Sequence, residues 1–346
     1  MKRTVTGIFV FALLFVFMMA SGPVLAQTKP AAGAAVLKIS HQWPGGTLEK
    51  GDFRDRLCRI FAKKVEEKTS GAIKFEIHPA SVLFKPVPQY DAMLKGALDM
   101  SVFPLDYAAG KVPQFSITLM PCIVKDHRHA MRWKDAAVGK EIEKICEENG
   151  IKIIAWGWCG GGIASKAKPI KAPADLKGMK LRAAGKMFET MLHEGAGAAI
   201  TSMPSSEIYF GLQTGVLDVC LTSSSSFESY RLYEQVKYYT SPKQTTIWYM
   251  LEPLVISMVT WKKLSPDQQK IFMDVGKEIE AFALEEAIKD DTEVTKLFQE
   301  KGVQVYDMTP DDFKVWLEVS KSTAWKTFAE KVKGGKELLD MAQAAK

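Results

Sequence analysis

The sequence has few cysteines and histidines, and they follow none of the spacings that mark a metal centre or a disulfide framework. Its five cysteines include no CxxC pair and no Cys/His motif typical of zinc sites. His127 and His129 stand close together, but no third ligand lies near them in the sequence, so we predict neither a metal site nor a cofactor. A chain of this length builds a sufficient core without cross-links, so we expect buried or semi-buried free thiols. The cysteines are Cys58, Cys122, Cys146, Cys159 and Cys220.

Catalytic motifs are missing as well. The sequence has no GxSxG, HExxH, P-loop or GxGxxG pattern, and the glycine run at residues 160–162 lacks the strand–turn–helix context of a phosphate cradle. We interpret that run as flexible backbone at a crossing between two lobes. Asp99 and Asp218 are the candidate bases of an exported hydrolase, but an aspartate at the turn before a strand commonly binds backbone amides. We therefore do not expect an enzyme.

Neither sign of charge dominates the chain. It has 46 lysines and arginines against 40 aspartates and glutamates, a formal net charge of +6. The lysine-rich segments that begin at Lys237 and Lys326 lack the aligned aromatic side chains of a nucleic-acid surface. The composition therefore argues against nucleic-acid binding, while a mild positive field suits an anionic ligand.

The one long apolar run lies at the N-terminus. Lys2 and Arg3 precede an uncharged run at residues 8–19, and small residues follow before Gln27. A membrane-spanning helix needs about 20 apolar residues, so the run is short for an uncleaved anchor, which is the alternative interpretation. We predict that residues 1–26 are a cleaved signal peptide and that the mature protein is exported.

The first ordered segments predict a parallel sheet. Residues 36–40 alternate like a strand, apolar residues recur at helical spacing over residues 53–65, and residues 72–77 alternate again. A strand–helix–strand order of this kind is typical of an α/β domain.

A helix–Gly–strand unit occurs twice. The segment PQYDAMLK from Pro88 is followed by Gly96 and the strand-like ALDMSVF, and PSSEIYFGLQT from Pro204 is followed by Gly215 and VLDVCL. The repeat predicts two similarly built lobes, with the ligand in the crevice between them.

Between and after these units, the pattern predicts how the chain joins the lobes. Residues 151–158 are expected to be a strand that leads to the crossing, and residues 248–259 a further strand that returns to the first lobe. From residue 266 to about residue 300, apolar residues recur at intervals of three and four, which indicates a long amphipathic helix.

Arg182 is the leading candidate for ligand binding. It ends the short strand-like segment MKLR and is followed by Ala-Ala-Gly, which leaves space around its guanidinium group. An arginine in such a setting can hold a carboxylate through two parallel hydrogen bonds, which lysine cannot do. From the pattern alone, a surface arginine remains the alternative. Aromatic residues near predicted strand ends and loops could add apolar contacts: Trp43, Phe103, Tyr107, Trp156, Trp158, Trp248 and Tyr249.

Several segments together resemble the solute-binding subunits of TRAP transporters, the DctP type. They are DLKGMKLR from Asp175, PSSEIYFGLQTGVLD from Pro204 and YEQVKYYT from Tyr233. The N-terminal half agrees through LKISHQWP, VEEKTSGAIKFEIHPAS, MLKGALDM and VPQFSITLMPCIVKD, so the resemblance covers about residues 37–264.

The resemblance implies an α/β, two-lobed periplasmic binding protein, type II-like, with a long helix spanning both lobes. Lobe I is then expected at residues 33–157 plus about 247–288, and lobe II at residues 158–246 plus about 289–346. Such a protein captures a small organic acid in the periplasm and passes it to a small and a large membrane permease subunit, of the DctQ and DctM type. We expect a monomer. Presentation of the ligand to a membrane sensor kinase is the alternative.

The resemblance also implies the ligand-binding residues. Arg182 falls on the carboxylate-binding arginine of the family. Gln42, Trp43, Lys85, Phe103, Tyr107, Ser205 and Thr222 fall on pocket positions, and Trp248 is added as an aromatic residue at a predicted strand end.

Departures from the family pattern bear on the ligand. Gly161 and Gly162 stand where binders of sugar acids have a second arginine, and Thr222 stands where an asparagine is usual. With fewer polar anchors beside Arg182, the site predicts an apolar or aromatic monocarboxylate of the 2-oxo acid type. Lys85 keeps a C4-dicarboxylate open as the alternative, since it could meet a second carboxylate.

Overall fold

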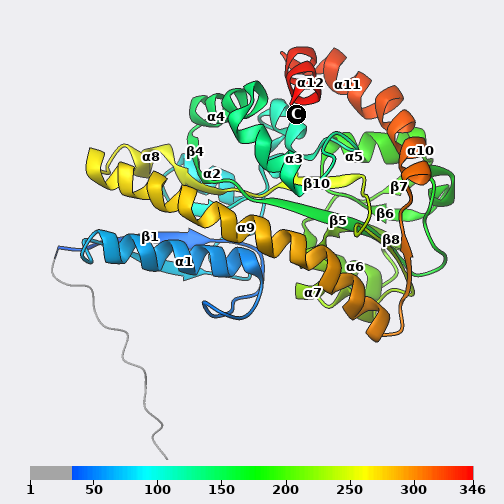
Figure 1. The fold of residues 1–346 in the computed structure, drawn as a ribbon, viewed down its shortest axis with the longest axis horizontal. Coiled ribbons are helices and arrows are strands. Elements are labelled where there is room, and N and C mark those ends of the chain that lie inside the picture. The colour runs from blue at the N-terminus through cyan, green and yellow to red at the C-terminus, as the bar shows by residue number, and fades with distance from the viewer. Residues whose placement is uncertain (1–32, 346) are drawn as a thin grey trace, which may run out of the picture.

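The computed structural model describes residues 33–345, which form two lobes joined by one long helix (Figure 1). The predicted signal peptide, residues 1–26, lies outside the described residues. Each lobe is built around its own sheet, and the two sheets share no strand. We call the part around the five-stranded sheet the first lobe and the part around the seven-stranded sheet the second lobe.

The first sheet has the strand order β2-β1-β3-β11-β4. β1 pairs in parallel with β2 and β3, as the strand–helix–strand pattern predicts, while β11 runs antiparallel to both of its neighbours. The sheet is therefore mixed, because its fourth position is filled by a strand from late in the chain. Its strands are β1 (Ala35–Ser40), β2 (Ile73–His78), β3 (Met100–Val102), β4 (Ile151–Ala155) and β11 (Leu254–Ser257).

The second sheet has the order β12-β9-β5-β8-β6-β7, and β10 pairs with β5 outside this path. β6 and β8 run in parallel, which brings their carboxyl ends to one edge of the sheet. Its strands are β5 (Trp158–Ser165), β6 (Lys180–Arg182), β7 (Ala199–Ile200), β8 (Val219–Ser223), β9 (Tyr238–Ser241), β10 (Trp248–Leu251) and β12 (Gln304–Asp307).

The repeated helix–Gly–strand unit occurs once in each lobe, as the sequence predicts. Gly96 and Gly215 both have positive φ, +67° and +75°, which a glycine adopts at little cost. The aspartates that follow them also match: Asp99 accepts the amide of Lys38 at 2.8 Å, and Asp218 accepts the amide of Lys180 at 3.0 Å. Each carboxylate therefore holds a neighbouring strand in place through a hydrogen bond to its backbone.

Three local predictions are wrong. The segment predicted as one strand at residues 151–158 is divided between β4, which ends at Ala155 in the first sheet, and β5, which begins at Trp158 in the second. Residues 248–257 form two strands: β10 lies in the second sheet and β11 in the first, so the chain crosses between the lobes at Glu252 and Pro253. The glycine run at residues 160–162 is no flexible crossing either, because it lies within β5. There glycine is required by close packing, since a Cβ on Gly161 would lie 2.1 Å from the carbonyl oxygen of Thr222.

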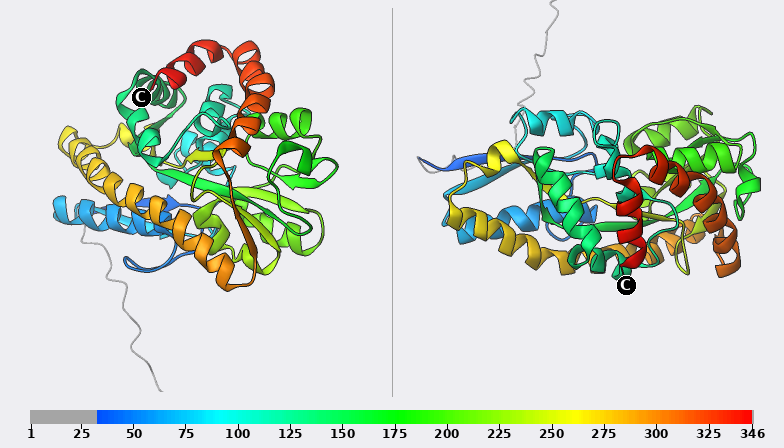
Figure 2. Two further views of the ribbon diagram at one scale, coloured as in Figure 1. Left: turned by 45° about the vertical axis from the view of Figure 1, so that its right-hand side comes forward. Right: turned by 90° about the horizontal axis from the view of Figure 1, so that it is seen from above.

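Helix α9 (Pro266–Glu300) is the long helix that the sequence predicts, and it crosses both lobes (Figures 1 and 2). It begins with a capping box between Ser265 and Gln268. Near its start, Phe272 packs in the core of the first lobe with α1, and near its end, Phe298 packs in a cluster of the second lobe. One continuous helix thus contributes to both cores.

The remaining helices cover the sheets and close the C-terminal end. α10, α11 and α12 lie one after another on the side of the molecule opposite α1 (Figure 1). None of the helices between residues 33 and 345 combines the length and apolarity that a membrane crossing requires. The helices other than α9 are α1 (Phe53–Lys68), α2 (Gln89–Leu94), α3 (His127–Arg132), α4 (Ala137–Glu148), α5 (Lys186–Thr190), α6 (Ile208–Gln213), α7 (Ser224–Ser229), α8 (Met258–Trp261), α10 (Pro310–Ser320), α11 (Lys326–Lys331) and α12 (Gly335–Ala344). Short 3₁₀-helical segments are η1 (Leu105–Ala108), η2 (Pro113–Leu119), η3 (Trp133–Asp135), η4 (Pro173–Leu176), η6 (Ser205–Glu207) and η7 (Leu232–Glu234), and short π-helical segments are η5 (Met191–Gly195) and η8 (Lys321–Trp325).

All five cysteines are buried and free, in agreement with the expectation from the sequence. The two neighbouring histidines diverge: His127 pairs with Asp291 of α9 at 2.7 Å, whereas Nδ1 of His129 accepts the amide of Lys125 at 3.0 Å. Both histidines therefore connect parts of the fold.

Candidate ligand-binding site

Arg182 is the last residue of β6, and its side chain is only 1% exposed. Its Nε donates to the carbonyl oxygen of Met203 at 2.9 Å, and its Nη1 donates to that of Leu221 at 2.7 Å. No carboxylate within residues 33–345 forms an ion pair with it. A buried cation without a counter-ion is costly in a folded protein, so this arrangement favours an anion supplied from outside.

The backbone bonds also orient the guanidinium group. An arginine has five N–H donors, and the bonds to Met203 and Leu221 use one on Nε and one on Nη1. The Nη2 end reaches only the hydroxyl oxygen of Tyr107, at the long distance of 3.4 Å. The fixed group therefore keeps N–H donors on both terminal nitrogens for a ligand, as a carboxylate clamp requires.

Tyr107 places its hydroxyl at the meeting point of the two lobes. It belongs to η1, which follows β3 of the first sheet, whereas Arg182 and Ser205 belong to the second lobe. The hydroxyl oxygen lies 3.4 Å from Gln42 Nε2 and accepts the backbone amide of Ser205 at 3.1 Å. Four residues predicted from the sequence thus meet around one oxygen: Arg182, Tyr107, Gln42 and Ser205.

Three further predicted residues form the buried surroundings of this centre. Phe103 packs edge-to-face on Tyr107, with ring centroids 6.3 Å apart. Thr222 directly follows Leu221 on β8, and Trp248 lies on β10 against Phe188 at 4.9 Å. All three side chains are buried, and their part in ligand contact stays a prediction.

Lys85 is set apart from the other predicted residues. It is exposed in the connection between β2 and α2, and among the described residues it forms no hydrogen bond or ion pair. Its proposed role in holding a second carboxylate therefore stays a prediction without a contact to support it.

Trp43 lies beside a second buried arginine that the sequence interpretation missed. The guanidinium carbon of Arg54 lies 3.9 Å from the centroid of the Trp43 ring, and Trp43 Nε1 donates to Ser226 Oγ at 3.3 Å. The tryptophan is fully buried in this arrangement. Its ring thus stacks on a cation of the protein itself.

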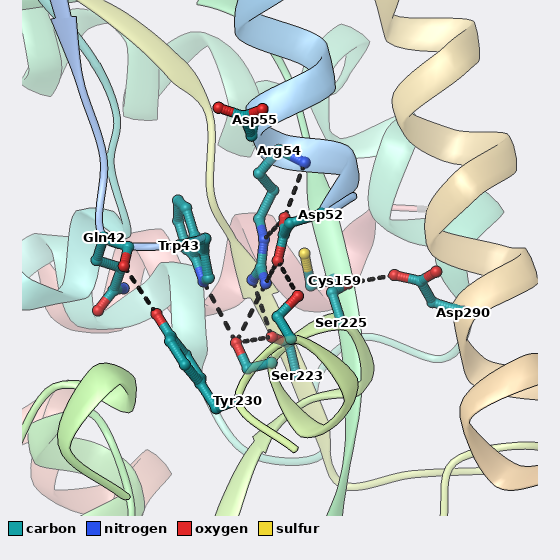
Figure 3. Close-up of polar contacts among 12 residues, drawn as sticks. Gln42, Trp43, Asp52, Arg54, Asp55, Cys159, Ser223, Ser225, Tyr230 and Asp290 are labelled. Carbon is teal, nitrogen blue, oxygen red and sulfur yellow. Dashed lines mark hydrogen bonds and ion pairs between the residues drawn. The ribbon is translucent and has the colours of Figure 1, made fainter. Parts of the chain in front are cut away.

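Arg54 is as buried as Arg182, at 1% exposure, but it is surrounded by acids (Figure 3). It pairs with Asp52 at 2.7 Å and with Glu252 at 2.8 Å. Burial alone would lower the pKa of the Arg54 guanidinium, but the charges of Asp52 and Glu252 outweigh it and raise that pKa above its ordinary value. The cation is therefore held permanently in its charged form.

The surroundings of Arg54 also tie the lobes together (Figure 3). Arg54 donates to Ser223 Oγ at 3.0 Å and to Ser226 Oγ at 3.2 Å, and both serines belong to the second lobe. Ser229 Oγ donates to Asp52 at 2.6 Å, and the Tyr230 hydroxyl donates to the carbonyl oxygen of Gln42 at 3.0 Å. We call these contacts the Arg54 cluster. Because Gln42 also contacts Tyr107 through its side chain, the cluster is connected to the surroundings of Arg182.

A cavity of about 810 Å³ opens beside Tyr107, between the two lobes. Its walls come from the first lobe, from the segment after β6 and from α11. They include Val87, Pro113, Met187, Met203 and Val332. A cavity of this size, mostly apolar with a few polar groups, is typical of a small-molecule site.

The fold is that of a two-lobed binding protein, with a candidate anion-binding centre at the junction of its lobes. Residues 40–331 match the family described as bacterial extracellular solute-binding protein, family 7, DctP. The chain belongs to this family, and the TRAP-type resemblance of the sequence is confirmed.

Individual relatives agree over nearly the whole chain. A solute-binding protein of Albidiferax ferrireducens is 45% identical over 326 residues, which are 93% of this chain and 96% of that protein. A crystal structure of a TRAP periplasmic solute binding protein from Rhodoferax ferrireducens, with bound malonate, is similar with a TM-score of 0.88 and 46% identity, covering 89% of this chain and 98% of that one. The C4-dicarboxylate-binding periplasmic protein DctP of Vibrio cholerae is 25% identical over 313 residues, which are 90% of this chain and 91% of that protein.

Proposed function

We propose that this protein captures a small organic acid in the periplasm by pairing the ligand's carboxylate with Arg182, and delivers it to the membrane subunits of a TRAP transporter. The observation that carries the proposal is the burial of Arg182 without a counter-ion, with its guanidinium group fixed by two backbone carbonyls. The malonate bound to the Rhodoferax ferrireducens relative agrees with a carboxylate ligand.

We expect the two lobes to close on the ligand, because the residues of the polar centre come from both lobes. The polar centre combines Arg182 and Ser205 of the second lobe with Tyr107 and Gln42 of the first. A ligand that touches both sides binds the closed arrangement more tightly than the open one, so it shifts the equilibrium toward closure. The Arg54 cluster joins the lobes through protein groups alone and would stabilise the closed arrangement further.

The ligand that fits this site best is a monocarboxylate with an apolar or aromatic remainder. The cavity beside Tyr107 is walled largely by apolar side chains; Arg182 contacts the Tyr107 hydroxyl, and Lys186 and Lys331 also line the cavity. A C4-dicarboxylate is the second candidate, since the Vibrio cholerae relative is a C4-dicarboxylate-binding protein. A C4-dicarboxylate would use Lys85 to hold its second carboxylate, whereas a monocarboxylate would not need Lys85.

A thermal-shift screen of the mature chain, residues 27–346, tests the proposal. The panel contains aromatic and branched monocarboxylates, including 2-oxo acids, together with C4-dicarboxylates and sugar acids. A ligand at one hundred times its dissociation constant stabilises the folded state by about 2.7 kcal/mol, which is visible as a shift in Tm. A hit among the apolar monocarboxylates supports the proposal, hits restricted to dicarboxylates support the second candidate, and no hit among the acids contradicts both.

Delivery to a permease is a separate step with its own test. The same receptor could present its ligand to a membrane sensor kinase. Reconstitution with small and large TRAP membrane subunits in proteoliposomes should give uptake of the bound acid only when this protein is added. Uptake that does not depend on the protein would contradict a transport role.

A further inference from the structure

Asp106 is a buried carboxylate that the anion-binding centre does not use. It lies in η1 directly before Tyr107 and is 5% exposed. Its Oδ1 is buried and has no hydrogen-bond partner among the described residues. Buried polar atoms in folded proteins nearly always have a partner, so a buried acceptor left free on a residue that lines a cavity points to a donor from a ligand.

Asp106 forms no ion pair within residues 33–345, although the charge of Arg182 acts on it. On the second lobe, the carboxylate abuts Gly185, where a Cβ would lie only 2.6 Å from Asp106 Oδ2. Burial raises the pKa of Asp106 to about 7, and the charge of Glu189 adds to this effect, while a hydrogen bond from Ser116 and the charge of Arg182 act in the opposite direction. Glu189, Lys186 and Lys331 line the same cavity, and none of the ion pairs in residues 33–345 includes Asp106.

Tyr107 connects the free acceptor with the anion-binding centre, although Arg182 itself is not among the residues that line the cavity. Asp106 and Tyr107 both line the cavity of about 810 Å³, and the Tyr107 hydroxyl contacts Arg182. A ligand whose carboxylate lies on Arg182 can therefore extend along Tyr107 into the cavity and pass Asp106. Its remainder would then meet the apolar walls formed by Met187 and Met203.

We infer that Asp106 is a specificity-determining residue, which accepts a hydrogen bond from a hydroxyl or amino group of the ligand. The inference rests on the proposed function and narrows it: the preferred ligand is a carboxylic acid that carries an O–H or N–H donor beside an apolar remainder. At pH 8, where Asp106 is largely ionised, a 2-oxo acid offers only acceptors at that position, so it would leave Asp106 Oδ1 unsatisfied. A site built to bind a donor discriminates strongly against an analogue that lacks it, because its buried polar group is then left unpaired.

The test uses probes that share a carbon skeleton and differ at one atom. These are 3-phenylpropionate, phenylpyruvate, 3-phenyllactate and phenylalanine, with a second series of the same four types on the isocaproate skeleton for a smaller remainder. Each is titrated into the mature wild-type protein at pH 8 by calorimetry. In at least one series we expect the hydroxy or the amino acid to bind at least tenfold more tightly than the acid with no substituent and the 2-oxo acid.

Asp106→Ala and Asp106→Asn separate a direct contact from a structural role. Asp106→Ala should abolish the preference for the donor-bearing acid while keeping the affinity for the unsubstituted acid within about threefold, which also shows that the variant is folded. Asp106→Asn keeps an acceptor oxygen but not the charge, so it should weaken an amino acid more than a hydroxy acid. If these variants do not fold, the comparison on the wild-type protein still decides.

Three outcomes would overturn the inference. The first is that unsubstituted or 2-oxo acids bind wild type as tightly as their hydroxy and amino counterparts in both series. The second is that Asp106→Ala weakens every acid equally. In either of these two cases, loss of acid binding in Arg182→Lys would still support the proposed pairing of the ligand's carboxylate with Arg182, although the inference about Asp106 has failed. The third is that no member of either series binds wild type, which would overturn the inference and the proposed monocarboxylate ligand together.

Discussion

Arg54 and Arg182 are equally buried, but they differ in what surrounds them. Arg54 is paired with two carboxylates, bonded to two serines and stacked on Trp43. Arg182 is bonded to two backbone carbonyls and a tyrosine hydroxyl, and no acid in the described part of the chain is paired with it. The first arrangement is complete within the protein and holds the lobes together. In the second, no residue between 33 and 345 supplies an anion, and we propose that a ligand's carboxylate does so.

The comparison also shows why burial alone does not identify a binding residue. A paired buried arginine has a structural role, because its removal leaves the paired carboxylates buried without a counter-ion. An unpaired buried arginine lowers the stability of the fold, because its positive charge has no counter-ion. In our proposal, the carboxylate of the ligand neutralises this charge. A substitution at Arg182 should therefore mainly lower ligand affinity, whereas the same substitution at Arg54 should mainly lower the free energy of unfolding.

The largest expected effect is the loss of ligand binding when Arg182 is changed. Arg182→Met should weaken binding of the acid found in the screen by about 3–5 kcal/mol, because the ligand's carboxylate would be buried without a cation. Arg182→Lys should recover little of this, since an ammonium group cannot make two parallel bonds. Calorimetry measures both affinities, and affinity within a few-fold of wild type would contradict the assignment.

The matched change at Arg54 should act on folding. Arg54→Met leaves Asp52 and Glu252 buried without their cation, so the free energy of unfolding should fall by about 3–5 kcal/mol. Arg182→Met should cost clearly less stability, because the groups that lose a donor are uncharged: the carbonyls of Met203 and Leu221 and the hydroxyl of Tyr107. Denaturant unfolding of the two variants side by side gives the difference, and equal losses would remove the distinction between the two sites.

Each region also contains a carboxylate with a raised pKa, which gives the comparison a pH dependence. Burial raises the pKa to about 7 for Asp106, near Arg182, and for Asp290, which accepts a hydrogen bond from Ser225 beside the Arg54 cluster. The folded state keeps these protons to about pH 7, whereas the unfolded chain loses them near pH 4. Stability from these groups is thus fully present below about pH 4 and is lost as the pH rises from there through about 7.

Replacing either group with asparagine should make Tm less dependent on pH. Between pH 5 and pH 8, the free energy of unfolding of the wild-type protein should fall by about 2 kcal/mol because of Asp106, and Asp106→Asn should remove this fall. Asp290→Asn should remove a similar fall independently. Only Asp106→Asn should also change the pH dependence of ligand binding. A thermal unfolding series over this pH range measures the first effect, and an unchanged pH profile in both variants would contradict the titration of these groups.

A smaller loss is expected where β5 passes the anion-binding centre. Gly161→Ala would place a Cβ 2.1 Å from the carbonyl oxygen of Thr222 and 2.5 Å from Trp248 Cδ1, so unfolding should become easier by about 1–3 kcal/mol. Gly110→Ala is the matched control, because a Cβ there meets nothing within 4 Å. Equal Tm values for the two variants would show that β5 can move away from β8 and β10.

The smallest expected effect comes from one hydroxyl of the Arg54 cluster. Ser226 Oγ accepts from Trp43 and from Arg54 across the lobes, so Ser226→Ala should weaken closure and reduce ligand affinity by about 1 kcal/mol, or roughly fivefold. Ser322→Ala, at an exposed serine of η8, is the control. An affinity equal to that of the control would indicate that the cluster does not contribute to closure.

The sequence predicted those features that depend on short stretches of chain. The capped amphipathic segment gave α9, the repeated Gly-x-Leu-Asp gave one matching unit in each lobe, and the MKLR segment gave Arg182. Each of these signals lies within about 35 residues, where periodicity and turn chemistry decide the structure.

The Arg54 cluster could not be predicted because its members are distant in the sequence. Arg54 lies 169 residues from Ser223 and 198 residues from Glu252, so no local pattern announces their contact. The requirement for glycine in β5 was missed for the same reason, since it comes from Thr222 and Trp248 on other strands. A stronger hint existed for Trp43, since an aromatic residue close to an arginine in sequence is a candidate for stacking.

The most direct measurement is a crystal structure of the mature protein with the tightest-binding acid from the screen. We predict that the ligand's carboxylate lies within hydrogen-bond distance of the Arg182 guanidinium group and the Tyr107 hydroxyl, with its remainder in the adjoining cavity and the Arg54 cluster unchanged. A carboxylate bound elsewhere, with Arg182 still bonded only to Met203, Leu221 and Tyr107, would contradict the account.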